Sequence, residues 1–183
     1  MSIVFSPYSP ITTELFEKIK KIKLLISDVD GVLSDGKIYL TNSGDEIKNF
    51  NVRDGFGIVA IQKIGINFAV ITGRSSNIVN TRMNSLGVEL IYQGVQDKVP
   101  YLNKIIDKLN ISKNEIAYIG DDVIDIPVFN CVGLSFCPKD AHPTVVAQAT
   151  YTCHCKGGDG AVREVCDLIL LAHNKIDLVG ASK

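Results

Sequence analysis

The chain has 183 residues and is 46% hydrophobic but only 7% aromatic, which is typical of one globular domain with a core rich in Val, Ile and Leu. Its 19 basic and 20 acidic residues are interspersed and give a net charge of −1, which argues against nucleic acid and anionic membranes as partners. No apolar run approaches the ~20 residues of a transmembrane helix, and residues 1–10 do not have the charged and apolar regions of a signal peptide, so we expect a cytoplasmic protein.

The first predicted elements are an amphipathic helix over residues 11–22 and a buried strand at residues 24–27. Apolar residues recur at helical spacing in the first stretch, and Thr12 or Thr13 can cap its start. The run Leu24-Leu25-Ile26-Ser27 is apolar without alternation, as in a strand that is covered on both faces.

Asp28 and Asp30 stand at the carboxyl end of this strand, with Gly31 after them. In open α/β sheets, ligands bind at that edge. Two carboxylates so close repel each other unless a positive charge lies between them. Taken alone, the pattern also fits an Asx-turn that closes a strand, and the rest of the chain has to decide between the two interpretations.

Residues 37–51 predict a β-hairpin, because two alternating arms flank the Gly-containing turn 42–45. A two-stranded hairpin is marginal in water by itself, so we expect it to pack on something, such as another subunit. The segment Asn51-Val52-Arg53-Asp54-Gly55 then leads into a helix. Arg53 and Asp54 either form an exposed loop ion pair, which contributes little, or contact a substrate.

Strands and helices alternate over the rest of the chain. Strands are predicted at 66–71, 88–92, 116–119, 132–136 and near 150–152, and helices at 77–86, 98–109, from Ala141 and at 161–172. This alternation predicts an α/β fold with a Rossmann-like parallel sheet, right-handed crossovers and helices on both faces. We expect a single domain over residues 1–183, with a flexible tail at 174–183.

Chemically useful side chains follow several of these strands. Thr72-Gly73-Arg74 ends one strand, Lys98 follows a further one, and Gly120-Asp121-Asp122 repeats the acidic pattern. Carboxylates at a helix start are also stabilised by the helix dipole, by roughly 0.3–1 kcal/mol each, so the acidic loop has a purely structural explanation too. If the strands are neighbours, these side chains form a site for phosphate and a divalent metal ion.

Cys153-His154-Cys155 looks like a fragment of a metal cluster. On a strand, however, His154 would point away from the two cysteines. No second ligand pair stands at zinc-finger spacing, so we do not expect zinc here. The five cysteines are odd in number and form no Cys-x-x-Cys pair, which argues against the disulfide framework of a secreted protein.

The four motifs resemble those of the haloacid dehalogenase superfamily in type and order, over nearly the whole chain: Asp28-Val29-Asp30-Gly31, Thr72-Gly73-Arg74, Lys98 and Gly120-Asp121-Asp122. More closely, the segments 51–55, 140–143 and 157–165 are similar to those of the 3-deoxy-D-manno-octulosonate 8-phosphate phosphatases. This resemblance implies a magnesium-dependent hydrolase that releases phosphate from that sugar phosphate in lipopolysaccharide biosynthesis.

The resemblance also implies a role for each motif. Asp28 would attack phosphorus and form an aspartyl-phosphate, and Asp30 would act as acid and then as base. Mg²⁺ would lie between Asp28, the backbone carbonyl of Asp30 and Asp121, with Asp122 and Asp125 around its waters. Thr72 and Gly73 would donate hydrogen bonds to the phosphoryl oxygens, and Lys98 would offset their charge and keep Asp28 ionised. The implied substrate-binding residues are Asp30, Asn51, Val52, Arg53, Asp54, Gly55, Gly73, Arg74, Arg82 and Lys98, with Arg163 a weaker candidate.

One departure from the family pattern bears on the substrate. Family members often carry a basic residue after the Asp-Gly-x-Gly-Ile segment, where this chain has Val59. A phosphatase for another sugar-acid phosphate, such as a sialic-acid-type 9-phosphate, or for a protein therefore stays open, as does a non-catalytic phospho-acceptor akin to a receiver domain. A receiver would place its acidic pair and its acceptor on different strands, and Asp30 two residues after the acceptor argues against that class.

The spacing of the motifs leaves no room for a cap domain between Asp30 and Thr72, or between Arg74 and Lys98. An uncapped site would leave a small substrate in water, where electrostatic catalysis is weak. We therefore expect the hairpin of one subunit to cover the site of a neighbour, with the tail as a second cover. The resemblance implies a homotetramer.

Overall fold

A computed structural model describes residues 2–176 of the chain. Its centre is a six-stranded parallel sheet in the order β10-β9-β8-β3-β6-β7. The strands are β3 (Leu24–Ser27), β6 (Asn67–Ile71), β7 (Leu90–Tyr92), β8 (Ile116–Ile119), β9 (Leu134–Cys137) and β10 (Tyr151–Thr152). This confirms the predicted α/β fold with a Rossmann-like parallel sheet. It also confirms that the strands before Asp28, Thr72 and Asp121 are neighbours.

Helices cover both faces of this sheet, as the alternation of strands and helices predicts. Successive residues of β3 point to opposite faces, so Leu25 and Leu24 belong to different hydrophobic clusters. One face packs against α1 (Thr13–Ile19), α2 (Val52–Lys63), α3 (Asn77–Ser85) and α7 (Ala161–Ala172). The other face packs against α4 (Val99–Leu109), α5 (Ile126–Phe129) and α6 (Pro143–Val146). Two short 3₁₀ helices, η1 (Lys113–Glu115) and η2 (Val123–Asp125), flank β8.

Helix α1 is shorter than the predicted helix over residues 11–22. Thr12 caps it, because the Thr12 side chain accepts the backbone N–H of Leu15 at 3.2 Å. An N-cap residue has an extended backbone, so the residue before it is outside the helix. Ile11–Thr12 instead forms β2, which pairs antiparallel with β1 (Ile3–Val4). Ile11 therefore belongs to a strand, and its helical spacing from the later apolar residues does not mean that one helix contains them all.

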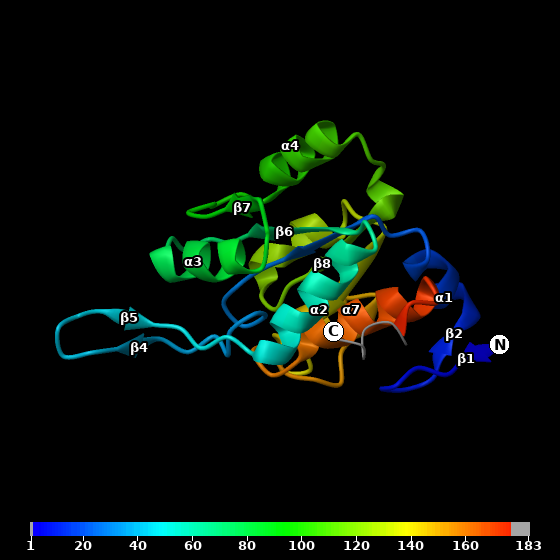
Figure 1. Cartoon of the computed structure of the whole chain (residues 1–183), viewed down its shortest axis with the longest axis horizontal. Coiled ribbons are helices and arrows are strands. Elements are labelled where there is room, and N and C mark those ends of the chain that lie inside the picture. Colours follow the sequence, from blue (N-terminus) through cyan, green and yellow to red (C-terminus); the bar gives the residue numbers. More distant parts are fainter. Residues whose placement is uncertain (1, 177–183) are drawn as a thin grey trace.

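The predicted hairpin is present but its paired strands are short. Strands β4 (Tyr39–Leu40) and β5 (Glu46–Ile47) form a separate antiparallel pair, and Figure 1 shows this hairpin projecting from the body of the molecule. The turn is closed by side chains, because Ser43 donates to Asp45 at 2.6 Å and lies 2.7 Å from the Thr41 hydroxyl. Ile38, Leu40 and Ile47 are exposed on it.

The described residues contain no cap domain. Between Asp30 and Thr72 lie only the hairpin, α2 and β6, and between Arg74 and Lys98 only α3 and β7. Helices α2 and α7 lie side by side across one face of the sheet (Figure 1). No helix within residues 2–176 is both long enough and apolar enough to span a bilayer. Most of the expected tail, residues 177–183, lies outside the described residues.

Candidate active site

Three neighbouring parallel strands bring Asp28, Thr72 and Asp121 to one edge of the sheet. Asp28 follows β3 directly, and its backbone N–H donates to Ile119 of β8 at 3.0 Å, so the strand pairing continues to the site. After Asp28 the chain turns sharply, since the backbone N–H groups of Leu33 and Ser34 both donate to the Val29 carbonyl at 2.9 Å. The nucleophile candidate therefore stands on a rigid strand end and not on a free loop.

A buried lysine connects two of the carboxylates. Lys98 Nζ lies 2.6 Å from Asp28 Oδ2, 2.6 Å from Asp125 Oδ1 and 3.1 Å from the Tyr118 hydroxyl. Burial raises the pKa of Asp28, and Lys98 opposes this effect. Burial alone would lower the pKa of Lys98, but the charges of Asp28 and Asp125 raise it. A buried ammonium held by two carboxylates is charged, and it balances only one of them.

Asp121 completes a group of three carboxylates with Asp28 and Asp125. One oxygen from each lies within 4.8 Å of the others, and residues 2–176 contain no other such group of three acidic, His or Cys side chains. Burial, followed by repulsion from Asp28 and Asp125, raises the pKa of Asp121 to about 8. Three carboxylates around one ammonium leave an excess of negative charge. A divalent cation bound by oxygen ligands would neutralise it.

Gly31 allows the first acidic loop to approach the second. Its φ is +84°, and a Cβ atom built on it would lie 2.0 Å from Asp121 Oδ2. No side chain fits in that space, and few residues adopt that backbone conformation. The glycine of the Asp-x-Asp-Gly motif is therefore needed for close packing as well as for the turn.

Asp125 organises the second acidic loop. Its Oδ2 accepts the backbone N–H groups of Asp121 at 3.0 Å and Asp122 at 3.2 Å, while Oδ1 is taken by Lys98 and Tyr118. Both oxygens of Asp125 are thus engaged, so it is less suited than Asp121 to bind a metal ion. The sequence analysis did not include Tyr118, whose place on a buried strand gave it the appearance of an ordinary core residue.

Asp30 belongs to a second group of charges, which includes two residues of the hairpin. Lys48 Nζ contacts Asp30 Oδ1 and lies 3.4 Å from Glu46. Arg74 lies 2.6 Å from Glu46 and 3.9 Å from Asp30 Oδ2. The sequence analysis missed Lys48 and Glu46. Their spacing of two residues on one hairpin arm, which places them on the same face, was the available signal.

Thr72 is buried at the end of β6. Its backbone N–H donates to Tyr92 at 2.9 Å and its carbonyl accepts from Val95 at 3.1 Å. Gly73 follows it, and Arg74 extends from there to Glu46 and Asp30. The end of β6 therefore places the Thr72 hydroxyl, the Gly73 backbone and the Arg74 guanidinium beside β3.

The segment 51–55 has structural roles that the sequence analysis did not foresee. Asn51 caps α2, because its side chain accepts the backbone N–H of Arg53 at 2.9 Å. The Asp54 carboxylate is buried and accepts the backbone N–H of Arg163 at 2.7 Å, so it caps the start of α7. Val52 and Arg53 are exposed.

Two further arginines have partners outside the carboxylate group. Arg82 lies against α2, where a Cβ atom on Gly55 would be 2.3 Å from its Nη2 atom. Arg163 bonds to Asp167 at 2.8 Å and stacks over the Phe56 ring. No hydrogen bond or ion pair within residues 2–176 links Arg53, Arg82 or Arg163 to Asp28, in contrast to Arg74, which reaches Asp30.

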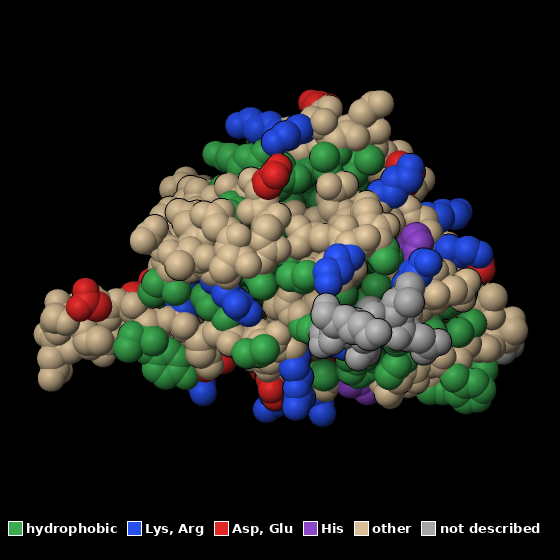
Figure 2. Space-filling view, in the orientation of Figure 1, with side chains coloured by type: hydrophobic (Ala, Val, Ile, Leu, Met, Phe, Trp, Pro, Cys, Tyr) green, Lys and Arg blue, Asp and Glu red, His purple; other side chains and the backbone are tan. Residues whose placement is uncertain are grey.

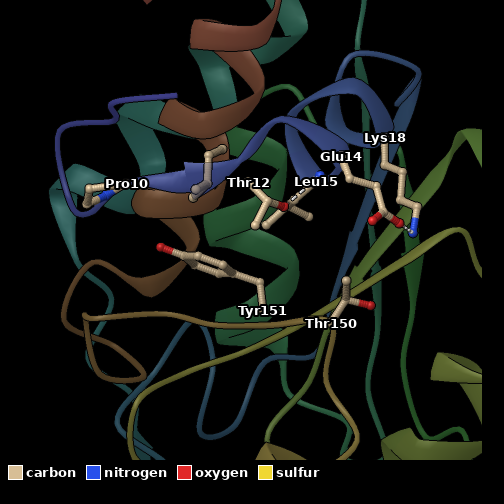
Figure 3. A pocket seen from close by; sticks show the side chains of 8 residues that line it. Pro10, Thr12, Glu14, Leu15, Lys18, Thr150 and Tyr151 are labelled. Atoms are coloured by element: carbon tan, nitrogen blue, oxygen red, sulfur yellow. Dashed lines mark hydrogen bonds and ion pairs between the residues drawn. The ribbon is translucent and has the colours of Figure 1, made fainter. Parts of the chain in front are cut away.

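The segment Cys153-His154-Cys155 lies against the carboxylate of Glu164. Glu164 is buried and accepts the backbone N–H groups of His154 and Cys155 at 2.9 and 3.0 Å. The pocket in Figure 3 lies nearby, between β2, α1 and β10, with Tyr151 and Thr150 on one side and the Glu14–Lys18 ion pair on the other. None of the carboxylates at the carboxyl edge of the sheet lines that pocket.

Comparisons with known proteins agree with this geometry. A family model described as haloacid dehalogenase-like hydrolase matches residues 77–165. The chain is 49% identical to the 3-deoxy-D-manno-octulosonate 8-phosphate phosphatase of Salmonella typhi, over 93% of this chain and 90% of that protein. The crystal structure of the Yersinia pestis phosphatase of the same name superimposes with a TM-score of 0.94 at 46% identity, covering 96% of this chain and 95% of that one.

A second similar structure contains ligands. It is the phosphatase of that name from Moraxella catarrhalis, described as a complex with a magnesium ion, a phosphate ion and a KDO molecule. The TM-score is 0.89 at 42% identity, and the match covers 92% of this chain and 97% of that one. With these matches over nearly its whole length, the chain belongs to the haloacid dehalogenase-like hydrolases and, within them, to the family of the 3-deoxy-D-manno-octulosonate 8-phosphate phosphatases.

Proposed function

We propose that this protein hydrolyses 3-deoxy-D-manno-octulosonate 8-phosphate to 3-deoxy-D-manno-octulosonate and phosphate, with Mg²⁺ as cofactor, in lipopolysaccharide biosynthesis. One observation carries the proposal: Asp28, at the end of the central strand, is held by Lys98 at 2.6 Å beside the carboxylates of Asp121 and Asp125. The three relatives reported above, which bear the name of this activity, are 42–49% identical to this chain.

The residues at this edge of the sheet suit Mg²⁺. Asp28, the backbone carbonyl of Asp30 and Asp121 would hold the ion, because all three offer the hard oxygen ligands that it prefers. The excess negative charge around Lys98 supports the same assignment. When bound, the ion neutralises the charge of the carboxylates and of the phosphoryl oxygens.

The chain's own residues would carry out the reaction in two steps. First, an Asp28 oxygen attacks phosphorus, the bond between phosphorus and the sugar oxygen breaks, and Asp30 gives that oxygen a proton. Then water attacks phosphorus, Asp30 takes its proton, and the bond to Asp28 breaks to release phosphate. Lys98 would balance charge on Asp28 throughout.

Phosphate and sugar would be bound by different residues. Thr72, Gly73 and Lys98 would contact the phosphoryl group, since they lie at the ends of strands adjacent to Asp28 or against Asp28 itself. Arg74 is the strongest candidate for the sugar carboxylate, because its side chain is 48% exposed and its guanidinium already lies beside Asp30. The remaining predicted substrate residues, Asn51, Val52, Arg53, Gly55 and Arg82, would act from a neighbouring subunit, and Asp54 would hold their segment against the start of α7.

A homotetramer in which the hairpin of one subunit covers the site of another would supply the missing cover. The hairpin exposes Leu40 at 67% and Ile47 at 53%, and Val52 at the start of α2 is also exposed. Burial of such side chains between subunits is favourable, by about 25 cal/mol per Å² of apolar surface. It would also exclude water from the site, which strengthens electrostatic catalysis.

The test is phosphate release, with Mg²⁺, from three substrates: 3-deoxy-D-manno-octulosonate 8-phosphate, a sialic-acid 9-phosphate and an aryl phosphate. A strong preference for the first supports the proposal, together with loss of activity in Asp28→Asn. Equal and slow turnover of all three would remove the substrate assignment but keep the phosphatase chemistry. Preference for the sialic-acid phosphate would point to Val59, the position that departs from the family.

A further inference from the structure

Four side chains of alternating charge form a closed ring beside Asp28. The ring runs from Asp30 to Lys48, on to Glu46 at 3.4 Å, to Arg74 at 2.6 Å, and back to Asp30 at 3.9 Å. Its members come from three segments that are distant in sequence: the loop after β3, the arm of the hairpin and the loop after β6. The ring therefore joins the projecting hairpin to the proposed acid and base.

Lys48 differs from the other cation of the ring in its burial. Its side chain is only 3% exposed, whereas that of Arg74 is 48% exposed. A buried ammonium is costly unless it is paired, and here two carboxylates surround it. Because water is largely excluded from Lys48, its attraction to Asp30 is screened less than that of Arg74.

The orientation of Asp30 depends mainly on Lys48. The other polar contacts of the Asp30 carboxylate are long: 3.4 Å from Ser34 Oγ to Oδ1, and 3.9 Å from Arg74 Nε to Oδ2. The terminal torsion of an Asp side chain is broad, so a carboxylate with only such contacts would sample several orientations. The contact with the buried Lys48 ammonium gives the Asp30 carboxylate one orientation.

We propose that Lys48 is a positioning residue that holds the Asp30 carboxylate for the second step of the reaction. In that step a water oxygen bonds to phosphorus, Asp30 Oδ takes the water proton, and the bond between phosphorus and Asp28 breaks as Asp28 leaves as a carboxylate. This inference rests on the aspartyl-phosphate chemistry of the proposed function but not on the identity of the sugar. It gives the hairpin a role within its own subunit's site.

The test compares Lys48→Met and Lys48→Arg with the unchanged protein, using 4-nitrophenyl phosphate and the sugar phosphate with Mg²⁺. In Lys48→Met we expect a rapid first release of nitrophenol, close to one per subunit. The steady rate that follows should be at least about tenfold lower than in the unchanged protein, since positioned bases contribute about 10²–10⁴-fold to the rate. Acid quenching should trap phosphorylated protein. Lys48→Arg should recover most of the steady rate. Lys18→Met, which removes an exposed lysine with one ion pair, is the control.

Three outcomes would overturn the inference. An unchanged steady rate in Lys48→Met excludes the role, and a higher KM at constant kcat makes Lys48 a substrate contact. Equal loss of the first and later turnovers of the aryl phosphate makes Lys48 a structural residue, because nitrophenolate leaves without a proton from Asp30. Turnover of the aryl phosphate but not of the sugar phosphate by the unchanged protein would refute only the substrate assignment. A crystal structure of Lys48→Met gives a readout without any substrate, because an unmoved Asp30 carboxylate would refute the positioning role.

Discussion

The Asp54 carboxylate accepts the backbone N–H of Arg163 at 2.7 Å, so a residue in the first turn of α2 caps the first turn of α7. The pairing joins two helices that lie side by side on one face of the sheet (Figure 1). Asp54 Oδ2 is buried and has no hydrogen-bond partner within the part of the chain that the structure describes. Burial accordingly raises the pKa of Asp54 from 3.8 to about 6.

This shift predicts a pH-dependent contribution of Asp54 to stability. The native state holds the proton more tightly than the unfolded chain, so the contribution falls as the pH rises from about 4 to about 6, by up to about 3 kcal/mol. Replacement by Asn removes the titration. The difference in free energy of unfolding between Asp54→Asn and the unchanged protein, measured by urea titration, should change across this range and be flat above about pH 7. The exposed Glu17→Gln is the control, and a difference independent of pH would refute the account.

Asp54 also marks a limit of sequence analysis. The sequence analysis predicted either an exposed ion pair or a substrate contact for Asp54, whereas the structure buries its carboxylate against a partner that is 109 residues away. Local patterns do not contain that information. The strand-end motifs were predictable for the opposite reason: parallel strands bring their carboxyl ends to one edge, so the place of Asp28, Thr72 and Asp121 follows from topology. Lys48 was missed because its partner is set by how the hairpin folds over the loop after β3.

Metal binding should depend on pH through Asp121. Burial, with the charge of Asp28 next, raises the pKa of Asp121 to about 8 without a metal, so a proton must leave before Mg²⁺ binds. We expect the rise in Tm caused by millimolar Mg²⁺ to be larger at pH 8 than at pH 6, measured by differential scanning calorimetry.

Asp121→Asn provides the control for this experiment, since it removes both the titration and a proposed ligand. The Mg²⁺-dependent rise in Tm should shrink strongly in that variant and lose its pH dependence. Equal stabilisation of the unchanged protein at both pH values would show that Asp121 does not control binding.

We expect Glu164, which is far from Asp28 in sequence, to stabilise the folded protein. It is fully buried and accepts the N–H groups of His154 and Cys155 and the Tyr151 hydroxyl at 2.8 Å. In Glu164→Gln an amide N–H would face these donors, which leaves buried groups unpaired and costs about 2–3 kcal/mol. Urea unfolding measures this loss, with the exposed Glu14→Gln as the matched control.

The same variant tests a link to the loop after β3. The segment held by Glu164 continues to Gly158, whose N–H donates to Val32 at 2.9 Å. Hydrogen exchange at Gly158 should therefore be faster in Glu164→Gln, by an amount that matches local opening. If hydrogen exchange at Gly158 is unchanged, the destabilisation caused by Glu164→Gln is limited to the segment around Cys155.

The exposed hairpin side chains should hold the proposed tetramer together. Leu40→Ser combined with Ile47→Ser removes apolar surface from the projecting arm, where both are more than half exposed and contribute little to the fold of the subunit. We expect the double variant to dissociate, as measured by size-exclusion chromatography with light scattering. Its Tm should fall only by the amount that the loss of assembly causes. Its kcat/KM for the sugar phosphate should also be lower. Ile3→Ser, at another exposed site, is the control. A variant that dissociates but keeps full activity would show that no neighbour completes the site.

Gly31 and Gly44 form a matched pair that separates backbone strain from steric exclusion. Both have positive φ, +84° and +88°, so alanine is strained at either position by a similar amount, about 1 kcal/mol. A Cβ atom on Gly31 would collide with Asp121 Oδ2 at 2.0 Å, whereas one on Gly44 meets nothing within 4 Å. Gly31→Ala should therefore displace the Asp121 carboxylate and lower kcat by at least about 10²-fold, since small misplacements of catalytic groups have effects of that size. Gly44→Ala should keep kcat within about twofold. If both variants lose activity equally, or neither does, the packing of the first acidic loop against the second is not what aligns the site.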